Sequence, residues 1–102
     1  MRRIIDGRMY NTETAVEICG ISHSHYTDFH HYEETLYKTP KGAFFLVGEG
    51  GPLSKYARSL GNNSRGGGDR WTVLSEAEAR EFAEIHASTK AYIAHFGEPE
   101  EG

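Results

Sequence analysis

Cysteine is nearly absent from this chain of 102 residues, and Cys19 is the single example. A lone cysteine excludes an internal disulfide framework and is typical of a reducing compartment, so we expect a cytoplasmic protein. No apolar run approaches the roughly 20 residues that are needed to span a bilayer. The opening residues, Met-Arg-Arg-Ile-Ile-Asp, lack the hydrophobic stretch of a signal peptide, and we therefore expect no membrane partner.

Basic residues are outnumbered by acidic residues, 11 to 15, and the formal net charge is −4. This balance disfavours a protein that coats DNA, because affinity for phosphates requires dense positive charge. The charge is unevenly distributed, since residues 53–74 carry a net +3 and residues 75–102 carry −5. Mixed signs are typical of a solvated surface. The alternative interpretation is a docking face that steers a charged partner.

Two segments carry the signature of a β-hairpin. Asp6-Gly7 is a preferred pair for the type I′ turn, whose central residues both have positive φ, and it predicts a hairpin over residues 3–10. A Pro-Lys-Gly loop suits a type I turn and predicts a second hairpin between strands at 34–39 and 43–47. Residues 43–47 are continuously apolar, which indicates a central strand with both faces covered.

Three further segments are expected to be helical. A capping-box spacing predicts a short helix over residues 12–19. Apolar residues at i, i+3, i+4 and i+7 predict a second helix over residues 52–60, with proline in its first turn. A second capping box, Ser75 to Glu78, predicts one long helix over residues 75–96.

The remaining segments complete an α+β interpretation. Residues 21–32 and 62–69 are polar and predict loops, and residues 71–74 predict a last strand. We expect a small antiparallel β-sheet with helices packed on one face and a long C-terminal helix. The length suits a single α+β domain over residues 1–97, followed by a disordered acidic tail at 98–102.

Four histidines fall within nine residues, with one aspartate among them: His23, His25, His30, His31 and Asp28. A His-x-His pair on a strand places two imidazoles on the same side, as in many metal sites. The spacing departs from the His-x-His-x-Asp-His signature of metallo-hydrolases, because Asp28 lies five positions after His23 rather than four. We therefore favour a polar loop with surface histidines and expect no metal.

The other patterns that suggest chemistry have structural explanations. The glycine-rich segment 48–55 lacks the spacing of a phosphate loop or a dinucleotide fingerprint, and Glu49 would repel a phosphate. Cys19 has no adjacent base in sequence, which favours a buried small side chain over a nucleophile. Glu33 and Glu34 alternate sides on a strand and do not form a catalytic pair. We expect no catalytic residue and no cofactor.

Distinctive residue patterns occur in five segments: Asp6–Ala15, Glu33–Leu46, Gly48–Ala57, Gly61–Ser64 and Leu74–Glu84. Together they resemble a largely uncharacterised family of small bacterial proteins carried by plasmids, integrative elements and phages. The resemblance covers roughly residues 4–96, and it implies an accessory protein of a mobile element that works in the bacterial host cell. Small acidic proteins of such elements are often inhibitors of host defence, including anti-CRISPR proteins, so the resemblance implies this function class.

The leading hypothesis is a non-enzymatic protein-binding inhibitor of a bacterial defence complex, such as a CRISPR effector. The candidate partner-binding residues lie in the glycine-rich turn, the basic stretch and the last helix: Glu49, Lys55, Arg58, Asn62, Asn63, Arg65, Arg70, Glu76, Glu81 and Glu84. In one version, the acidic side chains of the last helix stand in for nucleic-acid phosphates.

Two alternatives remain open. The first is an accessory regulator that contacts DNA or RNA through Arg58, Arg65 and Arg70, with Trp71 stacking on bases. Tyr26, Phe29 and Tyr32 could also stack on bases, but acidic residues flank their histidine-rich loop, so we rate direct nucleic-acid contact below protein contact. The second alternative is a small metal-dependent enzyme that uses the histidine-rich loop between His23 and His31.

Overall fold

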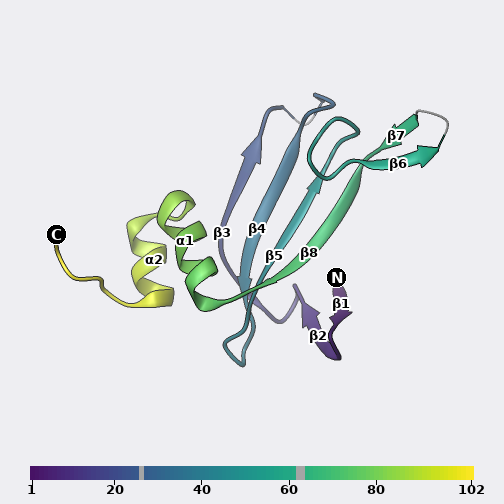
Figure 1. Ribbon diagram of the computed structural model, residues 1–102. Helices are drawn as coiled ribbons and strands as arrows, with labels where there is room; N and C mark the ends of the chain where they lie inside the picture. The colour runs from purple at the N-terminus through teal and green to yellow at the C-terminus, as the bar shows by residue number, and fades with distance from the viewer. Residues whose placement is uncertain (26, 62–63) are drawn as a thin grey trace.

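Four antiparallel strands form the main sheet of this α+β fold, which we describe from a computed structural model (Figure 1). The structure describes residues 1–25, 27–61 and 64–102, and Tyr26, Asn62 and Asn63 lie outside the described residues. The elements in chain order are β1 (Arg2–Ile5), β2 (Arg8–Asn11), β3 (Val16–His23), β4 (Tyr32–Lys38), β5 (Phe44–Gly50), β6 (Arg58–Gly61), β7 (Ser64–Gly66), β8 (Gly68–Leu74), α1 (Glu76–His86) and α2 (Thr89–Phe96). The main sheet has the order β3-β4-β5-β8, and β1-β2 and β6-β7 form separate hairpins.

The two faces of the main sheet have different neighbours, because side chains along a strand alternate between faces. Helices α1 and α2 pack against the face that carries Leu36 and Phe44, which we call the helix face (Figure 1). The β1-β2 hairpin contributes Tyr10 to the opposite face, which carries Phe45 and Trp71 and which we call the hairpin face. We call the end where β3 finishes and β8 begins the distal end.

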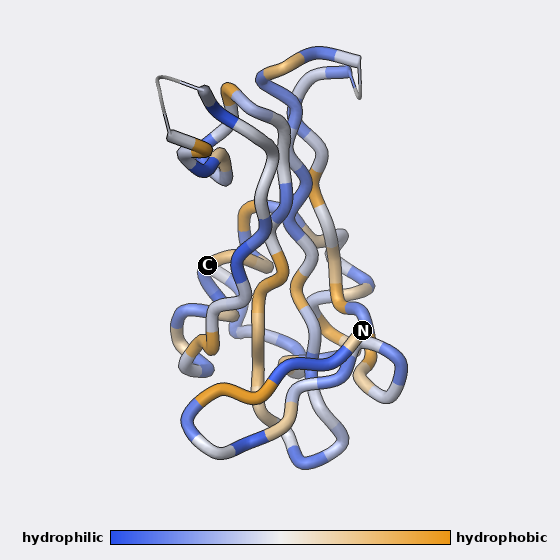
Figure 2. The backbone as a smooth tube through the Cα atoms, turned by 90° about the vertical axis from the view of Figure 1, so that its right-hand side faces the viewer, coloured by the Kyte–Doolittle hydropathy of each residue, from blue (hydrophilic) through white to orange (hydrophobic). Residues whose placement is uncertain are grey.

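Small residues bring the first helix close to the sheet. Ala79 and Ala83 are 0% and 1% exposed and pack with Leu36 and Phe44. The second helix adds Phe96, whose ring stacks on that of Phe44 with centroids 5.4 Å apart. The helices therefore cover the half of the helix face that lies away from the distal end, and Figure 2 shows polar (blue) chain at the distal end.

The hairpin face has an aromatic core. Phe45 is 0% exposed, and its ring stacks on Tyr37 and Trp71 with centroids 5.1 and 5.5 Å apart. The edge of Tyr10 meets the same ring at 5.4 Å. Tyr10 lies on β2, and the type I′ turn predicted between β1 and β2 is confirmed. Asp6 and Gly7 both have positive φ, at 50° and 78°.

The second predicted hairpin is also confirmed, since β4 and β5 pair in register from Tyr32↔Gly50 to Lys38↔Phe44. Strand β5 lies inside the sheet, with β4 and β8 on its two sides, as the apolar run predicts. Phe44 on the helix face and Phe45 and Val47 on the hairpin face are buried.

The prediction of a helix over residues 12–19 is wrong. The residues that predicted a helix cap form a single turn instead. In this turn the Asn11 side chain accepts a hydrogen bond from the Glu13 amide, and the Asn11 carbonyl accepts one from the Ala15 amide. From Val16 onward the chain is strand β3, which pairs with the whole length of β4. The β-branched residues of this segment suit a sheet, and strand pairing outweighs the local helical signal. The strand also extends to His23, into the predicted loop 21–32.

The helix predicted over residues 52–60 is wrong as well. Residues 52–56 form turns, and the chain then enters strand β6. Of the four apolar positions that predicted the helix, Tyr56 is buried, whereas Leu53 and Leu60 are 47% and 64% exposed. The predicted loop 62–69 also contains strand β7 and the start of β8.

The expected long C-terminal helix is two short helices. Ala87 and Ser88 adopt extended backbone conformations, and the Ser88 side chain accepts a hydrogen bond from the Ala91 amide at 3.1 Å. This second N-cap lets α2 fold back so that Phe96 reaches the sheet. Gly97 ends α2 with a positive φ of 86°, as predicted. Among the described residues, no helix has the length and apolarity needed to cross a membrane.

The capping box of α1 gives a first testable result. The Ser75 hydroxyl accepts from the Glu78 amide at 3.2 Å, and the Glu78 carboxylate accepts from the Ser75 amide at 2.9 Å. We expect Ser75→Ala to lower the free energy of unfolding by about 1 kcal/mol, measured by urea denaturation. The matched control Ser22→Ala removes a hydroxyl from an exposed position of β3 and should stay near the wild-type value. Equal losses in both variants would contradict the assignment.

Candidate functional site

A buried carboxylate lies on the helix face near the distal end. Glu34 is 6% exposed and sits on β4 two residues before Leu36, so the two side chains share a face. The Tyr56 hydroxyl donates a hydrogen bond to Glu34 Oε2, and Lys55 Nζ lies 3.1 Å from each carboxylate oxygen. A buried charge is tolerated when it is paired and hydrogen-bonded, and Glu34 meets both conditions.

The protonation of Tyr56 suits this arrangement. Burial and the adjacent Glu34 carboxylate raise the pKa of Tyr56 far above its ordinary value of about 10. The hydroxyl therefore stays protonated at physiological pH and remains a donor to Glu34. Tyr56 is 8% exposed, so the pair forms a fixed anchor between the segment after β5 and the sheet.

Glycines make room for this anchor. Gly48 lies opposite Glu34 in the register of β4 and β5, and a Cβ at this position would come within 2.0 Å of the Tyr56 ring. On β8, a Cβ at Gly68 would come within 2.4 Å of the Tyr56 carbonyl oxygen. Residues 51–57 therefore lie directly on the strands. The structural interpretation of the glycine-rich segment holds, although the turn leads into a folded-back loop rather than a helix.

Backbone hydrogen bonds fix the same loop to its neighbours. The Gly51 amide donates to the His31 carbonyl at 2.8 Å, and the Leu53 amide donates to the Phe29 carbonyl at 2.9 Å. Within the loop, the Ser54 hydroxyl donates to the Gly51 carbonyl at 2.8 Å. Lys55 and Tyr56 are thus presented by a loop that is tied to the β3-β4 connection as well as to the sheet.

Aromatic rings and cations alternate across the helix face at this end. The row, which we call the distal ladder, consists of His23 on β3, Tyr32 on β4, Lys55 and Tyr56 in loop 51–57, and Arg70 on β8. The His23 and Tyr32 rings stack at 4.9 Å, and Lys55 Nζ lies 4.8 Å from the Tyr32 centroid and 5.6 Å from that of Tyr56. Arg70 Cζ lies 5.2 Å from the Tyr56 centroid. Cation–π contacts of this kind hold long side chains in defined positions.

The cations of the ladder remain accessible. The Lys55 side chain is 51% exposed, and Arg70 is also exposed, although both contact the buried Tyr56. Arg58 joins them around a pocket of about 210 Å³. Three residues that the sequence proposed for partner binding, Lys55, Arg58 and Arg70, are therefore brought together.

A two-stranded arm extends from the same end of the molecule (Figure 1). We call strands β6 and β7 the distal arm, and none of their described residues is buried. Leu60 is 64% exposed, and its side chain lies over Gly66, where a Cβ would be 3.0 Å from Leu60 Cδ1. Arg58 pairs with Gly66 and so shares the face of Leu60, whereas Arg65 pairs with Ser59 on the other face of the hairpin. The arm therefore presents an exposed apolar side chain beside one guanidinium group, with a second guanidinium group on its other face.

Acidic side chains occupy the other face of the distal end. Glu33, Glu49 and Asp69 lie in register on β4, β5 and β8 and share the hairpin face. Arg3 Nη2 lies 3.2 Å from Asp69, and His31 Nε2 lies 3.5 Å from Glu33. Glu49 is thus separated by the sheet from Lys55 and Arg70, whereas Arg58 lines a pocket together with Glu49.

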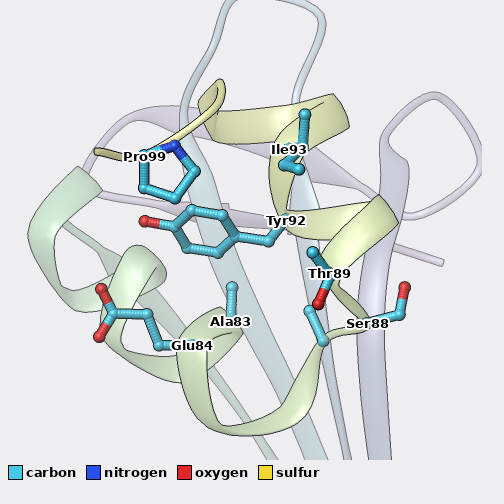
Figure 3. Close-up of a pocket in the computed structure, with 8 residues that line it drawn as sticks. Ala83, Glu84, Ser88, Thr89, Tyr92, Ile93 and Pro99 are labelled. Atoms are coloured by element: carbon cyan, nitrogen blue, oxygen red, sulfur yellow. The ribbon is translucent and has the colours of Figure 1, made fainter. Parts of the chain in front are cut away.

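The acidic candidates on α1 lie away from the distal end (Figure 1). Glu76, Glu81 and Glu84 are exposed, and Ile85 beside them is 74% exposed. Figure 3 shows Glu84 at a pocket of about 250 Å³ between α1 and α2, which Tyr92 and Pro99 also line. The remaining candidates, Asn62 and Asn63, lie outside the described residues.

The histidine-rich loop is organised by Asp28. Its carboxylate accepts from the Ser24 hydroxyl at 2.6 Å and from the His30 amide at 2.8 Å, and these hydrogen bonds lower the pKa of Asp28. His31 Nδ1 lies 3.0 Å from the Ser24 carbonyl oxygen. In the part of the chain that the structure describes, no three His, Cys, Asp or Glu side chains are placed to hold a metal ion. The loop geometry is explained by its own hydrogen bonds.

Cys19 has the environment of a structural thiol. It lies on β3, packs against the cluster of the helix face and is partly buried. Burial, with a smaller effect of Glu17, raises the pKa of the Cys19 thiol. A raised pKa lowers the thiolate fraction and with it the nucleophilicity.

Sequence reasoning missed Glu34 and Tyr56 as the anchor of the site. Glu33 and Glu34 do lie on opposite sides of a strand, as predicted. The same alternation places Glu34, two residues before Leu36, on the face of Leu36, and this signal is present in the sequence. The partner Tyr56 was assigned to a helix, so its approach to Gly48 could not be anticipated.

Comparisons with protein families, with curated proteins and with solved structures found no match to this chain. The functional assignment is therefore argued from the geometry of the distal end.

Proposed function

We propose that this chain is a non-enzymatic protein-binding module of a mobile element that inhibits a bacterial defence complex, such as a CRISPR effector. In this proposal, the distal arm and the distal ladder form the docking surface. The observation that carries it is Leu60, which is exposed beside Arg58 on an arm whose described residues include none that is buried. Isolated two-stranded hairpins are marginally stable, so contact with a partner would stabilise the arm.

The composition of the distal end supports a protein partner. Arginine and tyrosine are enriched among interface hot spots. Here the buried Glu34 fixes Tyr56, and the Tyr56 ring in turn contacts Arg70. Preorganised side chains lose less conformational entropy when they bind. The ladder therefore provides a rigid base from which the exposed arm contacts the partner.

Charge also favours protein over nucleic acid. The cations of the helix face are backed by the carboxylates of Glu33, Glu49 and Asp69 on the other side of the sheet. The phosphates of a nucleic acid would be attracted by these cations and repelled by the carboxylates. The repulsion weakens the electrostatic attraction on which non-specific binding depends. A protein surface can match such a pattern of alternating sign.

A second candidate function is contact with DNA or RNA at the same end. It is favoured by the convergence of Lys55, Arg58 and Arg70 around one pocket, next to stacked rings. This candidate requires retardation of an oligonucleotide that weakens steeply as salt rises. Absence of binding at low salt would remove it.

The inhibitor proposal is tested by plasmid interference in bacteria that carry an active CRISPR system. We expect expression of the chain to restore transformation by a targeted plasmid. The variant Arg58→Glu with Leu60→Asp should lose this protection, because two hot-spot losses of about 1.4 kcal/mol each weaken binding about 100-fold. The change removes exposed side chains only, so the fold should persist in circular dichroism.

The matched control changes a second exposed surface in the same way. Glu81→Lys with Ile85→Asp alters one charge and one apolar residue on α1, and it should retain protection. The control variant could instead lose protection while Arg58→Glu with Leu60→Asp keeps it. In that case docking occurs through α1, and the acidic side chains of α1 stand in for nucleic-acid phosphates. If the wild-type chain protects against none of the effectors, the inhibitor proposal fails.

A further inference from the structure

Another cavity lies at the end of the sheet opposite the distal ladder, between the β1-β2 hairpin and the β4-β5 turn. Its volume is about 680 Å³, within the range of small-molecule sites. We call it the foot pocket and define it by Arg8, Tyr10 and Asn11 from the hairpin and by Thr39 and Lys41 from the turn. Figures 1 and 2 both show this hairpin and this turn side by side.

The lining of the foot pocket has one sign of charge. Arg8 and Lys41 contribute cationic groups from two different elements, and no acidic side chain is among the residues that line it. Within the described ranges of the chain, neither cation forms an ion pair. Two unpaired like charges around one cavity repel each other, and a bound anion removes that repulsion.

Tyr10 supplies an independent observation. The residue is 5% exposed and its ring packs edge to face with that of Phe45, so the ring is fixed. Its hydroxyl has no hydrogen-bond partner among the described residues and is not buried, so it remains available to donate to a ligand. Arg8 and Tyr10 alternate on β2 and so share the face that turns toward the sheet. A guanidinium and an unpaired hydroxyl therefore border the same cavity.

We propose that the foot pocket binds a small organic anion, in which a phosphate or carboxylate group is carried on an apolar or aromatic body. Arg8 and Lys41 hold the oxyanion, and the Tyr10 hydroxyl donates to it. Pro40 and Ala43 provide the apolar wall against which the body of the ligand packs. This site is remote from the distal arm and is independent of the proposed function.

The test is titration of the isotopically labelled full chain, followed by amide chemical shifts. The probes are AMP, adenosine as its neutral counterpart, and benzoate as a carboxylate. We expect AMP, benzoate or both to shift the amides of residues 8–11 and 39–43 saturably, and adenosine to bind at least about tenfold more weakly than AMP because it lacks the charge. Saturation by one anion alone identifies the headgroup.

Variants separate the site from general charge attraction. Arg8→Gln and Lys41→Gln should each weaken binding about tenfold, and Tyr10→Phe should weaken it while leaving the ring packing intact. The control Arg2→Gln removes the same charge from the same hairpin outside the pocket and should not change the affinity. Equal binding of adenosine and AMP, shifts confined to the distal end, equal affinity in Arg8→Gln, or no saturable shift with any probe would overturn the proposal.

Discussion

Gly48→Ala should destabilise the chain by about 3 kcal/mol or more, which is a large fraction of the stability of a small domain. The new Cβ would fall 2.0–2.4 Å from two ring carbons and the hydroxyl oxygen of Tyr56, so the side chain must leave its place. Its departure exposes apolar surface and removes the hydroxyl donor from the buried Glu34. Both losses add to the free-energy cost. The measurement is chemical denaturation followed by tryptophan fluorescence.

The control for this variant is the same substitution in a neighbouring strand. At Gly20 on β3, a Cβ would lie 3.3 Å from the nearest atom, the Glu34 carbonyl oxygen, which requires a shift of only a few tenths of an ångström. Gly20→Ala should change the free energy of unfolding by less than about 1 kcal/mol. If the two variants are equally stable, Tyr56 does not pack on Gly48 and the anchor is wrongly described.

Tyr56→Phe should lower the free energy of unfolding by about 1–3 kcal/mol at neutral pH, because it leaves the buried Glu34 without its hydroxyl donor. The ring remains in place over Gly48, so the effect isolates the hydrogen bond. Adding Glu34→Leu to Tyr56→Phe should recover part of the loss, since the pair is then replaced by apolar groups. With the wild type and Glu34→Leu alone, these two variants form a double-mutant cycle, and a coupling energy near zero would contradict the assigned contact.

The same pair gives a pH dependence with a defined sign. The folded state raises the pKa of Tyr56 above its unfolded value of about 10, so the folded state retains a proton that the unfolded state releases. The stabilising contribution is therefore complete below about pH 10 and is lost as pH rises toward the folded pKa. The stability difference between wild type and Tyr56→Phe should shrink above pH 10, and a difference that grows with pH would contradict this.

Local signals predicted those parts of the fold that short-range chemistry determines. Asp6-Gly7 formed its turn because both residues adopt positive φ, and the box from Ser75 to Glu78 opened a helix because each side chain caps the amide of the other. The apolar run 43–47 became an internal strand because it is buried on both faces. Each of these outcomes depends on residues that are close in the chain.

The wrong predictions arose where distant pairing decided the structure. Residues 12–19 contain a good capping signal, but Val16 and Ile18 belong to a strand that pairs with β4. Residues 52–60 have helical spacing, but Gly48 allows Tyr56 to lie on the sheet, and the chain cannot then continue as a helix. Periodicity alone does not show which distant strand or glycine a segment will meet.

The sequence predicted several residues of the candidate site but not how they are arranged in space. The basic stretch was identified from charge, and three of its members do converge around one pocket. Glu49, predicted to bind a partner from the glycine-rich turn, lies on the opposite face of the sheet from Lys55 and Arg70 because of strand alternation. The anchor of Glu34 and Tyr56 required the register of β4 and β5, which the sequence does not state.

The central claim is that the distal arm, supported by the Glu34–Tyr56 anchor, contacts a protein. Its most direct test places a photoreactive amino acid at Leu60 and, in a separate variant, at the equally accessible Ile85. Both variants are irradiated in bacteria that contain the defence complex. The account predicts one discrete protein adduct from Leu60, which Gly48→Ala abolishes, and none from Ile85. An equal adduct from Ile85, adducts to nucleic acid alone, or no adduct from Leu60 would contradict it.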